Sequence, residues 1–507
     1  MKNIPRIVVA ATQSGAGKTT IVTGLLAALR QQGLQVQSFK AGPDYIDPGY
    51  HALASGRPAH NLDSWLTAPE ILPEILATEA AGADIAIIEG VMGLYDGGRQ
   101  GISSTAEIAK ILKAPVLLVI DAKSMGASAA AIALGFREYD KNVNLAGVII
   151  NRLGSDTHEA MVREAMAKIN MPVYGALRRD DGLSMPERHL GLVPVEENQE
   201  RAVVAHMGEV VTKSADLDKI IALARSAAPL PQADTLPLTA GQYNEARKCP
   251  PPQQVGARIP KQAASISPTS LKRQEEVLPM AKLEQRRYNC RIGVAKDEAF
   301  SFYYPASLKV LERLGAEIVT FSPLHDHEVP PVDGLLIGGG FPEMFAAQLA
   351  ANTAMRQALY GLAQKGMPIL AECGGYMYMK ESLQDFAGNS HAMVGALPGR
   401  TEMTSKLQMV GYVEAELTAD SVLGGKGEKI RGHEFHFSQE QAPAEEAAAF
   451  VFRKLRNNAK YPAGRRFKNV LGSYLHLHFA GCPQAAVNFV SQCAAYRQKR
   501  GQDNGKI

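Results

Sequence analysis

Cysteine and long apolar runs are scarce in this sequence, and each absence excludes a class of protein. The five cysteines lie at positions 249, 290, 373, 482 and 493 and include no CxxC pair. This scatter provides no disulfide framework and favours a reducing compartment, so we expect a cytoplasmic protein. No apolar run reaches the roughly 18 residues that a membrane span requires. Residues 1–6 lead into a strand-like run rather than a signal peptide.

The sequence also lacks an excess of either charge. Its 54 basic and 51 acidic side chains give a formal net charge of +3, which is too close to balance to indicate a nucleic-acid partner. Hydrophobic residues make up 46% of the chain and charged residues 21%, as in ordinary globular proteins. With 507 residues, the chain is long enough for two or three domains that each bury a core.

A phosphate-binding loop is the first motif along the chain. An apolar run at residues 7–11 leads into residues 12–20, which read TQSGAGKTT, and an amphipathic stretch follows at 21–29. The glycines let backbone N–H groups approach a polyphosphate, and the next helix offers its positive N-terminal end. The nucleotide-binding residues predicted from this loop are Ser14, Gly15, Ala16, Gly17, Lys18, Thr19 and Thr20.

Two residues of this loop have specific expected roles. Lys18 is expected to reach the outer phosphates, and the Thr19 hydroxyl is expected to hold Mg²⁺. Thr12 stands where such loops usually carry their first glycine. An ordinary surface loop is the alternative, but it leaves the joint occurrence of strand, loop, Lys-Thr pair and helix unexplained.

The first half alternates between strand-like and helix-like segments. Apolar runs at residues 6–12, 35–40, 84–89, 115–121 and 146–151 are typical of buried parallel strands. This alternation predicts a doubly wound α/β domain, with ligands at the carboxyl ends of its strands. Asn151 ends the last of these runs, where an adenine contact is expected; a helix or loop cap is the alternative.

Four carboxylates fall at the predicted strand ends. Asp44 and Asp47 lie in a Gly/Pro-bounded loop, where they could hold Mg²⁺, place a substrate, or form Asx turns. Glu89 ends a buried strand, and a charge there is costly unless it is paired or bound to metal. We therefore expect Glu89 to hold Mg²⁺ beside Thr19. Asp96 follows in a glycine-rich loop, where a turn former is the alternative.

Proline divides the chain into two halves. Nine of the 29 prolines lie between Pro229 and Pro279, and apolar periodicity disappears over the same stretch. Such a segment cannot bury enough apolar surface to offset its ordering entropy. We predict a nucleotide-binding domain at 1–227, a Pro-rich flexible linker at 228–288, and a second domain at 289–500.

The second half resumes the α/β alternation, with strand-like runs at 291–297, 316–322, 334–340, 368–372 and 470–479. The fourth run leads directly into Cys373, two glycines and helix-like residues. This order is typical of a nucleophile elbow, in which a sharp turn exposes the thiol and the helix N-terminus lowers its pKa. A buried structural thiol is the alternative.

Two further segments support a cysteine-nucleophile enzyme. Residues 338–343 end another strand and offer backbone N–H groups to an oxyanion. His476 lies about 100 residues after the cysteine, as expected of a separate base. His476 and His478 would share one face of an extended strand, so a metal pair is the alternative. Residues 432–438 alternate like a strand and indicate either a substrate-facing wall or simple packing.

Taken together, these motifs resemble those of the cobyrinic acid a,c-diamide synthase family, which are cobalamin-pathway glutamine amidotransferases. The stretches that carry the resemblance are residues 11–20, 40–48, 88–97, 338–343, 372–377, 432–436 and 473–476. The first half resembles dethiobiotin-synthetase-type nucleotide-binding domains, and the second resembles class I glutaminases. The resemblance implies two doubly wound α/β domains joined by the linker.

The resemblance also implies a division of chemistry. Cys373 would attack glutamine, with His476 as proton shuttle and the N–H groups of Gly339, Gly340 and Gly374 as the oxyanion site. ATP and Mg²⁺ would activate the a and c acetate carboxylates of a corrin polycarboxylate as acyl phosphates, which ammonia then converts to amides. The expected metal-site residues are Thr19, Asp44 and Glu89, and the expected substrate-facing residues are Tyr45, Asp47 and Asp96. A homodimer is compatible with the sequence.

Two departures and several rivals accompany this resemblance. Many glutaminases of this class carry Glu two residues after the histidine, but His478 stands there. What orients His476 is therefore open, and Glu372 or another acid is a candidate. The linker is also longer than the family needs. Rival acceptors are hydrogenobyrinic acid, nickel sirohydrochlorin and other corrin side chains. A P-loop ATPase switch with a non-catalytic second domain is the rival outside this enzyme class.

Overall fold

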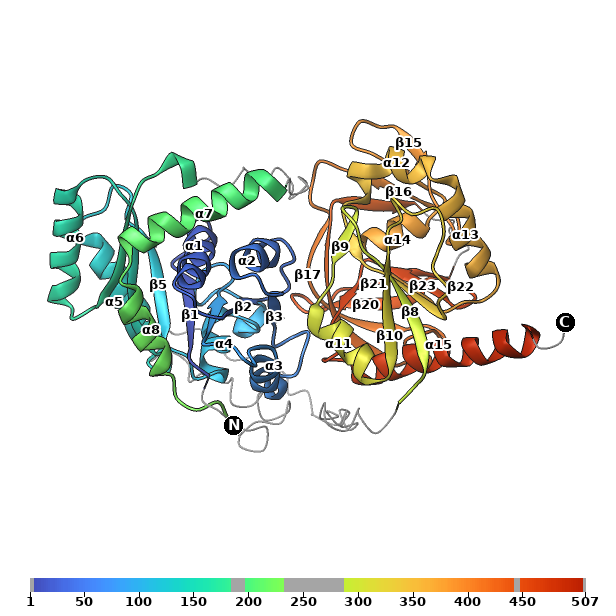
Figure 1. The fold of residues 1–507 in the computed structure, drawn as a ribbon, viewed down its shortest axis with the longest axis horizontal. Helices are drawn as coiled ribbons and strands as arrows, with labels where there is room; N and C mark the ends of the chain where they lie inside the picture. Colours follow the sequence, from blue (N-terminus) through green and yellow to red (C-terminus); the bar gives the residue numbers. More distant parts are fainter. Residues whose placement is uncertain (1–3, 184–196, 232–286, 442–446, 505–507) are drawn as a thin grey trace, which may run out of the picture.

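The computed structural model describes residues 4–183, 197–231, 287–441 and 447–504. Figure 1 shows two lobes side by side, one formed by the residues before 232 and the other by those after 286. Most of the predicted linker at 228–288, including Cys249, lies outside the described residues, so the domain boundaries remain predictions. Among the described helices, none is both long and apolar enough to cross a bilayer.

The first lobe is built on one parallel sheet of seven strands, in the order β3-β2-β4-β1-β5-β6-β7. The strands are β1 Arg6–Ala11, β2 Val36–Ala41, β3 His60–Leu62, β4 Ile85–Glu89, β5 Val116–Asp121, β6 Leu145–Leu153 and β7 Val173–Arg178. The five strand-like runs predicted from the sequence correspond to β1, β2, β4, β5 and β6. The predicted α/β class is confirmed.

Helices cover both faces of this sheet. They are α1 Lys18–Gln31, α2 Asp47–Ser55, α3 Leu72–Glu79, α4 Thr105–Ile111, α5 Ser128–Tyr139, α6 Asp156–Lys168, α7 Glu197–Ser214 and α8 Leu217–Arg225. Within β1, Ile7 and Val9 belong to the core shared with α1, α7 and α8, whereas Val8 belongs to the core shared with α3 to α6. Successive strand residues point to opposite faces, so one buried strand contributes to both layers.

The second lobe contains a six-stranded sheet in the order β10-β8-β11-β13-β23-β22. Its strands are β8 Cys290–Ala295, β10 Ala316–Phe321, β11 Gly334–Ile337, β13 Ile369–Glu372, β22 Arg465–Phe467 and β23 Val470–Ser473. The edge strand β22 is antiparallel and the others are parallel. The associated helices are α11 Pro305–Arg313, α12 Ala346–Ala351, α13 Thr353–Gln364, α14 Gly374–Met379 and α15 Pro483–Asn504.

Antiparallel strands extend this lobe beyond the predicted alternation. One sheet has the order β21-β20-β17-β18-β24, and another the order β15-β14-β16-β19. The first comprises β17 Met409–Leu417, β18 Lys429–His436, β20 Phe450–Lys454, β21 Lys460–Ala463 and β24 His476–Leu477. The second comprises β14 Ser382–Gln384, β15 Ser390–Ala392, β16 Arg400–Met403 and β19 Ser438–Gln441.

Two runs predicted as single strands are each divided between sheets. The run 470–479 splits into β23 in the central sheet and β24 in the antiparallel sheet. The run 334–340 splits into β11 and β12 Gly339–Gly340, and β12 pairs with β9 Phe300–Phe302. Apolar patterning reports burial but not the neighbouring strand, so these single-strand predictions were wrong. Both divisions bring functional segments out of the central sheet.

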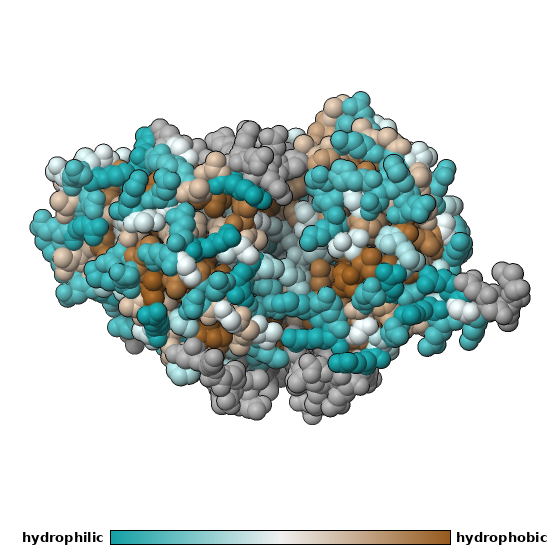
Figure 2. Space-filling view, in the orientation of Figure 1, coloured by the Kyte–Doolittle hydropathy of each residue, from teal (hydrophilic) through white to brown (hydrophobic). Residues whose placement is uncertain are grey.

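Aromatic side chains join the two lobes. Trp65, Leu66 and Tyr304 form a buried cluster, with Tyr45 and Tyr412 packed against it. Figure 1 shows β9 and β17 of the second lobe facing α2 and β3 of the first. In Figure 2, hydrophilic residues dominate the visible surface and hydrophobic ones form separate small areas. The lobes therefore meet through specific packed contacts at the edge where both sheets present their loops.

Candidate active sites

The phosphate loop joins β1 to α1 through a tight left-handed turn. Gly17 precedes the helix with φ 88°, and a β-carbon there would overlap the Asn151 amide. Asn151 Nδ2 donates to the carbonyl of Ala16 at 2.9 Å. Lys18 Nζ donates to the carbonyl of Met92 at 2.8 Å. Burial, aided by the charge of Lys40, lowers the pKa of Lys18 to about 8.

A buried charge cluster lies beside this loop. Thr19 Oγ1 donates to Glu89 at 2.7 Å and lies 3.3 Å from Asp47. Lys40 Nζ contacts Asp47 at 2.5 Å and Glu89 at 2.8 Å. His51 Nε2 lies 2.6 Å from the other Glu89 oxygen. Burial opposes the charged form of Glu89, but Lys40 prevails and lowers the pKa of this carboxyl.

Lys40 and His51 were not predicted from the sequence to belong to this cluster. Lys40 stands directly opposite Glu89 in the register of β2 and β4. The signal was available, since both residues end strand-like runs and an acid buried at such a position needs a cation. His51 carried no comparable signal, because its place depends on how α2 packs over the sheet.

The oxygen ligands in this cluster fit a small divalent cation. Thr19, Asp47 and Glu89 converge, whereas Asp44 Oδ1 already accepts the backbone N–H groups of Ile46 at 2.8 Å and Asp47 at 3.2 Å. Among the described residues there is no group of three or more His, Cys, Asp or Glu side chains suited to a metal. A hydroxyl and two carboxylates would leave coordination places for phosphate oxygens, as Mg²⁺ prefers.

A cavity of about 900 Å³ opens over the cluster, a volume suited to a small ligand. The predicted residues that line it are Ser14, Gly15, Gly17, Lys18, Thr19, Thr20, Asp44, Asp47, Glu89 and Asn151. The lining does not include Ala16, Tyr45 or Asp96. Asp96 is exposed and accepts the Gly93 N–H at 3.1 Å, and Tyr45 faces the second lobe.

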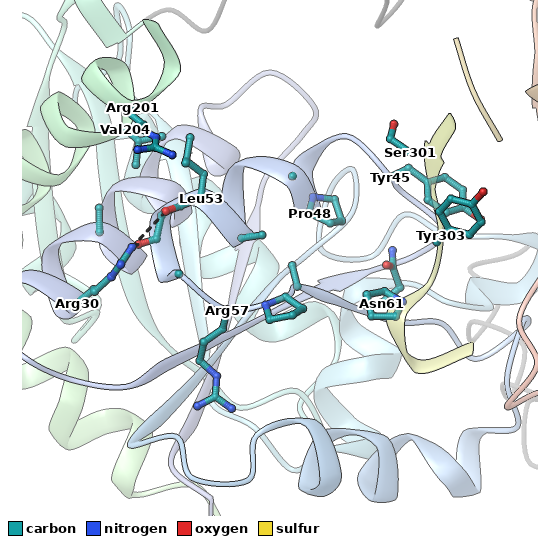
Figure 3. Close-up of a pocket in the computed structure, with 18 of the residues that line it drawn as sticks. Arg30, Tyr45, Pro48, Leu53, Arg57, Asn61, Arg201, Val204, Ser301 and Tyr303 are labelled. Carbon is teal, nitrogen blue, oxygen red and sulfur yellow. Dashed lines mark hydrogen bonds between the residues drawn. The ribbon is translucent and has the colours of Figure 1, made fainter. Parts of the chain in front are cut away.

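A second cavity, of about 1020 Å³, lies around α2 and reaches β9 of the second lobe (Figure 3). Figure 3 shows Tyr45, Tyr303 and Ser301 at one end, and Arg30 and Arg201 at the other. Arg30 lies 3.4 Å from the carbonyl oxygens of residues 53 and 54 at the end of α2. Its guanidinium therefore contacts the carbonyl end of α2.

In the second lobe, Cys373 forms the predicted elbow. It has φ 47° and ψ −102°, values that an L-residue adopts only under strain, and it joins β13 directly to α14. Its N–H donates to the carbonyl of Ser473 at 2.8 Å. The N–H of Gly375 donates to the carbonyl of Gly338 at 2.9 Å. Hydrogen bonds to Ser473 of β23 and to Gly338 beside the oxyanion strand therefore fix the turn from two sides.

The predicted oxyanion glycines lie between this elbow and His476. A β-carbon at Gly339 would lie 2.6 Å from His476 Cε1, and one at Gly374 would lie 3.0 Å from the backbone nitrogen of Gly340. Both positions therefore require glycine, because a side chain would displace the imidazole or the facing backbone. The structure places Gly339 beside His476, and it places Gly374, the residue after Cys373, beside Gly340.

The protonation state of Cys373 differs from the sequence-based expectation. Burial raises the pKa of its thiol, and the carboxylates of Glu343 and Glu372 add to the rise. The Gly374 N–H does lower the pKa, as the helix N-terminus was predicted to do, but burial outweighs it. The predicted net lowering was wrong. Burial also lowers the pKa of His476 to about 3, so the resting pair is a neutral thiol and a neutral imidazole.

The imidazole of His476 is held mainly by packing. Among the described residues, its buried Nδ1 has no hydrogen-bond partner. Glu372, which the sequence suggested as an orienting acid, accepts the N–H of Leu477 instead, and burial raises its pKa to about 8. The ring of His478 packs against Tyr304, with centroids 5.0 Å apart and an interplanar angle of 32°. The two histidines therefore face different neighbours and do not form a metal pair.

Comparisons with known proteins agree with this two-centre arrangement. Residues 7–193 match the CobQ/CobB/MinD/ParA nucleotide binding domain, and residues 291–483 match the CobB/CobQ-like glutamine amidotransferase domain. The chain is 42% identical over 496 residues to a cobyrinate a,c-diamide synthase of Dehalococcoides mccartyi, covering 96% of this chain and 98% of the relative. The chain belongs to the cobyrinate a,c-diamide synthase family.

Two other relatives in this family show the same extent of similarity. A hydrogenobyrinate a,c-diamide synthase of Streptomyces coelicolor is 43% identical, with 97% of this chain and 98% of the relative covered. A cobyrinate a,c-diamide synthase of Salmonella typhimurium is 38% identical, with 94% and 95% covered. The cobyrinate a,c-diamide synthase family membership makes the chain a glutamine amidotransferase ligase with a nucleotide-binding domain, so the predicted enzyme class is confirmed.

Proposed function

We propose that this chain amidates the a and c acetate carboxylates of cobyrinic acid, using ATP and the ammonia released from glutamine. The observation that carries the proposal is that one chain holds both a complete cysteine elbow and a complete phosphate-loop cluster. Relatives named for this reaction match nearly the whole chain, and the two centres supply the ammonia source and the activating site that it needs.

In the glutaminase half, Cys373 attacks the side-chain amide carbon of glutamine. His476 takes the thiol proton and delivers it to the leaving ammonia. The N–H groups of Gly339, Gly340 and Gly374 stabilise the oxyanion, and water then hydrolyses the γ-glutamyl thioester. Because the resting thiol is neutral, proton transfer to His476 accompanies the attack rather than preceding it.

In the synthetase half, Lys18 binds the outer phosphates of ATP, and Asn151 supports the loop through Ala16. Thr19, Asp47 and Glu89 would hold Mg²⁺, which neutralises phosphate charge during phosphoryl transfer. Lys40 pairs with both carboxylates and lowers the pKa of Glu89. The acceptor carboxylate becomes an acyl phosphate, and ammonia displaces phosphate to give the amide.

The substrate-facing roles of Tyr45, Asp47 and Asp96 and the metal role of Asp44 remain predictions. The geometry supports exchanging the roles of Asp44 and Asp47. Asp47 lies beside Thr19, whereas Asp44 fixes its own loop by accepting backbone N–H groups. Asp96 is exposed in the loop after β4 and retains access to an incoming acceptor.

Hydrogenobyrinic acid is the second candidate acceptor. It differs from cobyrinic acid by lacking the central cobalt, and a relative named for it is as similar to this chain as one named for the cobalt form. The chemistry at the acetate carboxylate is the same for both. The choice rests on contacts to the macrocycle rather than on either reaction centre.

Purified protein incubated with ATP, Mg²⁺ and glutamine tests the proposal when each tetrapyrrole is supplied separately. We expect mass spectrometry to show two successive carboxyl-to-amide conversions and equivalent release of glutamate. Glutamate release without any amidated tetrapyrrole would contradict the proposed acceptor class. A cytoplasmic location and a homodimer are part of the proposal, and size-exclusion chromatography with light scattering tests the latter.

A further inference from the structure

Tyr45 belongs to the nucleotide-binding lobe, but its ring lies in the glutaminase centre of the other lobe. It stacks on Phe302 at 4.9 Å with an interplanar angle of 9°, and on Tyr304 at 4.6 Å. Its centroid is 5.0 Å from that of His476, with the rings tilted by 45°. Tyr45 is therefore in direct contact with the imidazole expected to act as the glutaminase base.

The surroundings of His476 make this contact consequential. Its Nδ1 lacks a hydrogen-bond partner among the described residues, so no carboxylate fixes the ring. Gly339 closes one side, where even a β-carbon would collide with Cε1. The terminal torsion of histidine has a broad energy profile, so neighbouring surfaces decide how the ring is turned.

The same aromatic group supports the oxyanion strand. Phe302 lies in β9, which pairs with Gly339 and Gly340 of β12. Its Cβ would lie 3.3 Å from a β-carbon placed at Gly339. Tyr45 thus rests directly on the histidine and, through Phe302, on the strand β9 that pairs with the oxyanion strand β12. Its position therefore affects the two groups that must be aligned with Cys373.

The loop that carries Tyr45 is anchored in the first lobe. Asn61 Nδ2 donates to the carbonyl of Gly42 at 2.9 Å and to that of Asp44 at 2.7 Å. Two residues beyond Tyr45, Asp47 pairs with Lys40 in the charge cluster. Figure 3 shows Tyr45 at the same end of the cavity as Ser301 and Tyr303 of the second lobe. The loop therefore ties the histidine contact to the first domain.

We propose that Tyr45 is a positioning residue for His476, supplied in trans by the nucleotide-binding domain. It presses on the imidazole and holds it in the orientation from which it takes the Cys373 proton. The glutaminase centre is then complete only when the two domains are closed on each other. Tyr45 takes no part in bond making, and its aromatic surface matters rather than its hydroxyl.

This inference rests on the glutaminase half of the proposed function and is tested with full-length Tyr45→Leu. We expect glutamine hydrolysis to fall by about 10- to 100-fold, as for other misplaced catalytic groups. Inactivation by the glutamine analogue 6-diazo-5-oxo-L-norleucine, which depends on the aligned cysteine, is expected to slow in parallel. Both rates are measured without tetrapyrrole, so the predicted substrate-facing role of Tyr45 does not enter the comparison.

Tyr45→Phe and Trp65→Leu are the matched variants. Phenylalanine keeps the ring, so glutaminase activity is expected to be restored to within about twofold of wild type. Trp65→Leu removes an interdomain aromatic group that is not in contact with His476, and it should leave the inactivation rate close to wild type. If Tyr45→Leu does not fold, Tyr45→Met replaces it under the same expectations.

Two results would overturn the inference. One is unchanged glutaminase activity in Tyr45→Leu, and the other is an equal loss in Trp65→Leu, which would reduce Tyr45 to an interface residue. Failure of the proposed function looks different, because the wild-type protein would then hydrolyse no glutamine.

Discussion

The indole N–H of Trp65 donates to the carbonyl oxygen of Gly432 at 3.1 Å and so joins the two domains. The next residue, His433, stands opposite His476 in the ladder between β18 and β24. Tyr412, beside His433 on β17, donates to Asp63 of the first domain at 2.6 Å. The interface is therefore attached to β17 and β18, and β18 pairs with the strand β24 that carries His476.

Replacing Trp65 by Phe is expected to weaken this interface. The variant loses the bond to Gly432 and part of the cation–π contact with Arg431, whose guanidinium carbon lies 5.0 Å from the indole centroid. We expect a loss of about 1–2 kcal/mol in unfolding free energy, measured by denaturant titration. Tyr412→Phe, which removes the bond to Asp63, serves as the comparison. Two unaffected unfolding curves would show that these bonds do not stabilise the fold.

Cys373→Ser separates the two half-reactions. Glutamine-driven amidation is expected to fall by about 10⁴- to 10⁶-fold, because a nucleophile acting in a unit with its base has no substitute. Ammonia-driven amidation should remain near wild type, since the phosphate-loop cluster lies in the other domain. Both rates are measured by phosphate release with each nitrogen donor. Full glutamine-driven activity in the variant would exclude Cys373 as the nucleophile.

The pH dependence of Cys373 alkylation follows from its buried environment. Because burial raises the thiol pKa, the thiolate is a minor species at neutral pH, and its fraction grows about tenfold per pH unit. The rate of iodoacetamide modification should therefore rise steadily over roughly pH 6 to 9. Cys373→Ser corrects for the other cysteines. A plateau below neutral pH would indicate a lowered pKa instead.

Asp47 and Asp44 are distinguished by their Mg²⁺ requirement. Asp47→Asn removes an oxygen anion beside Thr19 and should raise the Mg²⁺ concentration for half-maximal activity by about 10- to 100-fold. Asp44→Asn retains its role towards the backbone N–H groups and should shift this concentration less. Direct Mn²⁺ binding in the presence of ADP, followed by electron paramagnetic resonance, provides a second measurement. The opposite order would return the metal role to Asp44.

Glu343 provides a stability test with a defined sign. Burial raises its pKa from 4.5 to about 7 in the folded protein, so the folded state binds more protons than the unfolded state between these values. Stability is therefore lost as the pH rises from about 4.5 to about 7. Glu343→Gln has no such charge to bury, and its advantage should grow by about 1–3 kcal/mol between pH 5 and pH 8. Thermal melts at both pH values measure this difference, and a pH-independent one would contradict the raised pKa.

Much of both centres could be predicted from short stretches of consecutive residues. The phosphate loop from β1 to Lys18 is recognised from its own sequence, because a buried strand followed by a glycine turn has few alternative conformations. The same holds for Cys373, whose positive φ is imposed between β13 and α14. These motifs also carried the resemblance that the comparisons confirm.

Contacts between distant segments were decided only by the tertiary structure. Lys40 forms an ion pair with Glu89. Asp47, rather than the predicted Asp44, lies beside Thr19. Tyr45 of the first domain contacts His476 of the second. The division of residues 470–479 between two sheets separates His476 from His478, and burial reverses the predicted pKa shift of Cys373. Sequence patterns report which residues are apolar and where the chain turns. Neither register nor desolvation can be deduced from them, because both depend on segments that come together only on folding.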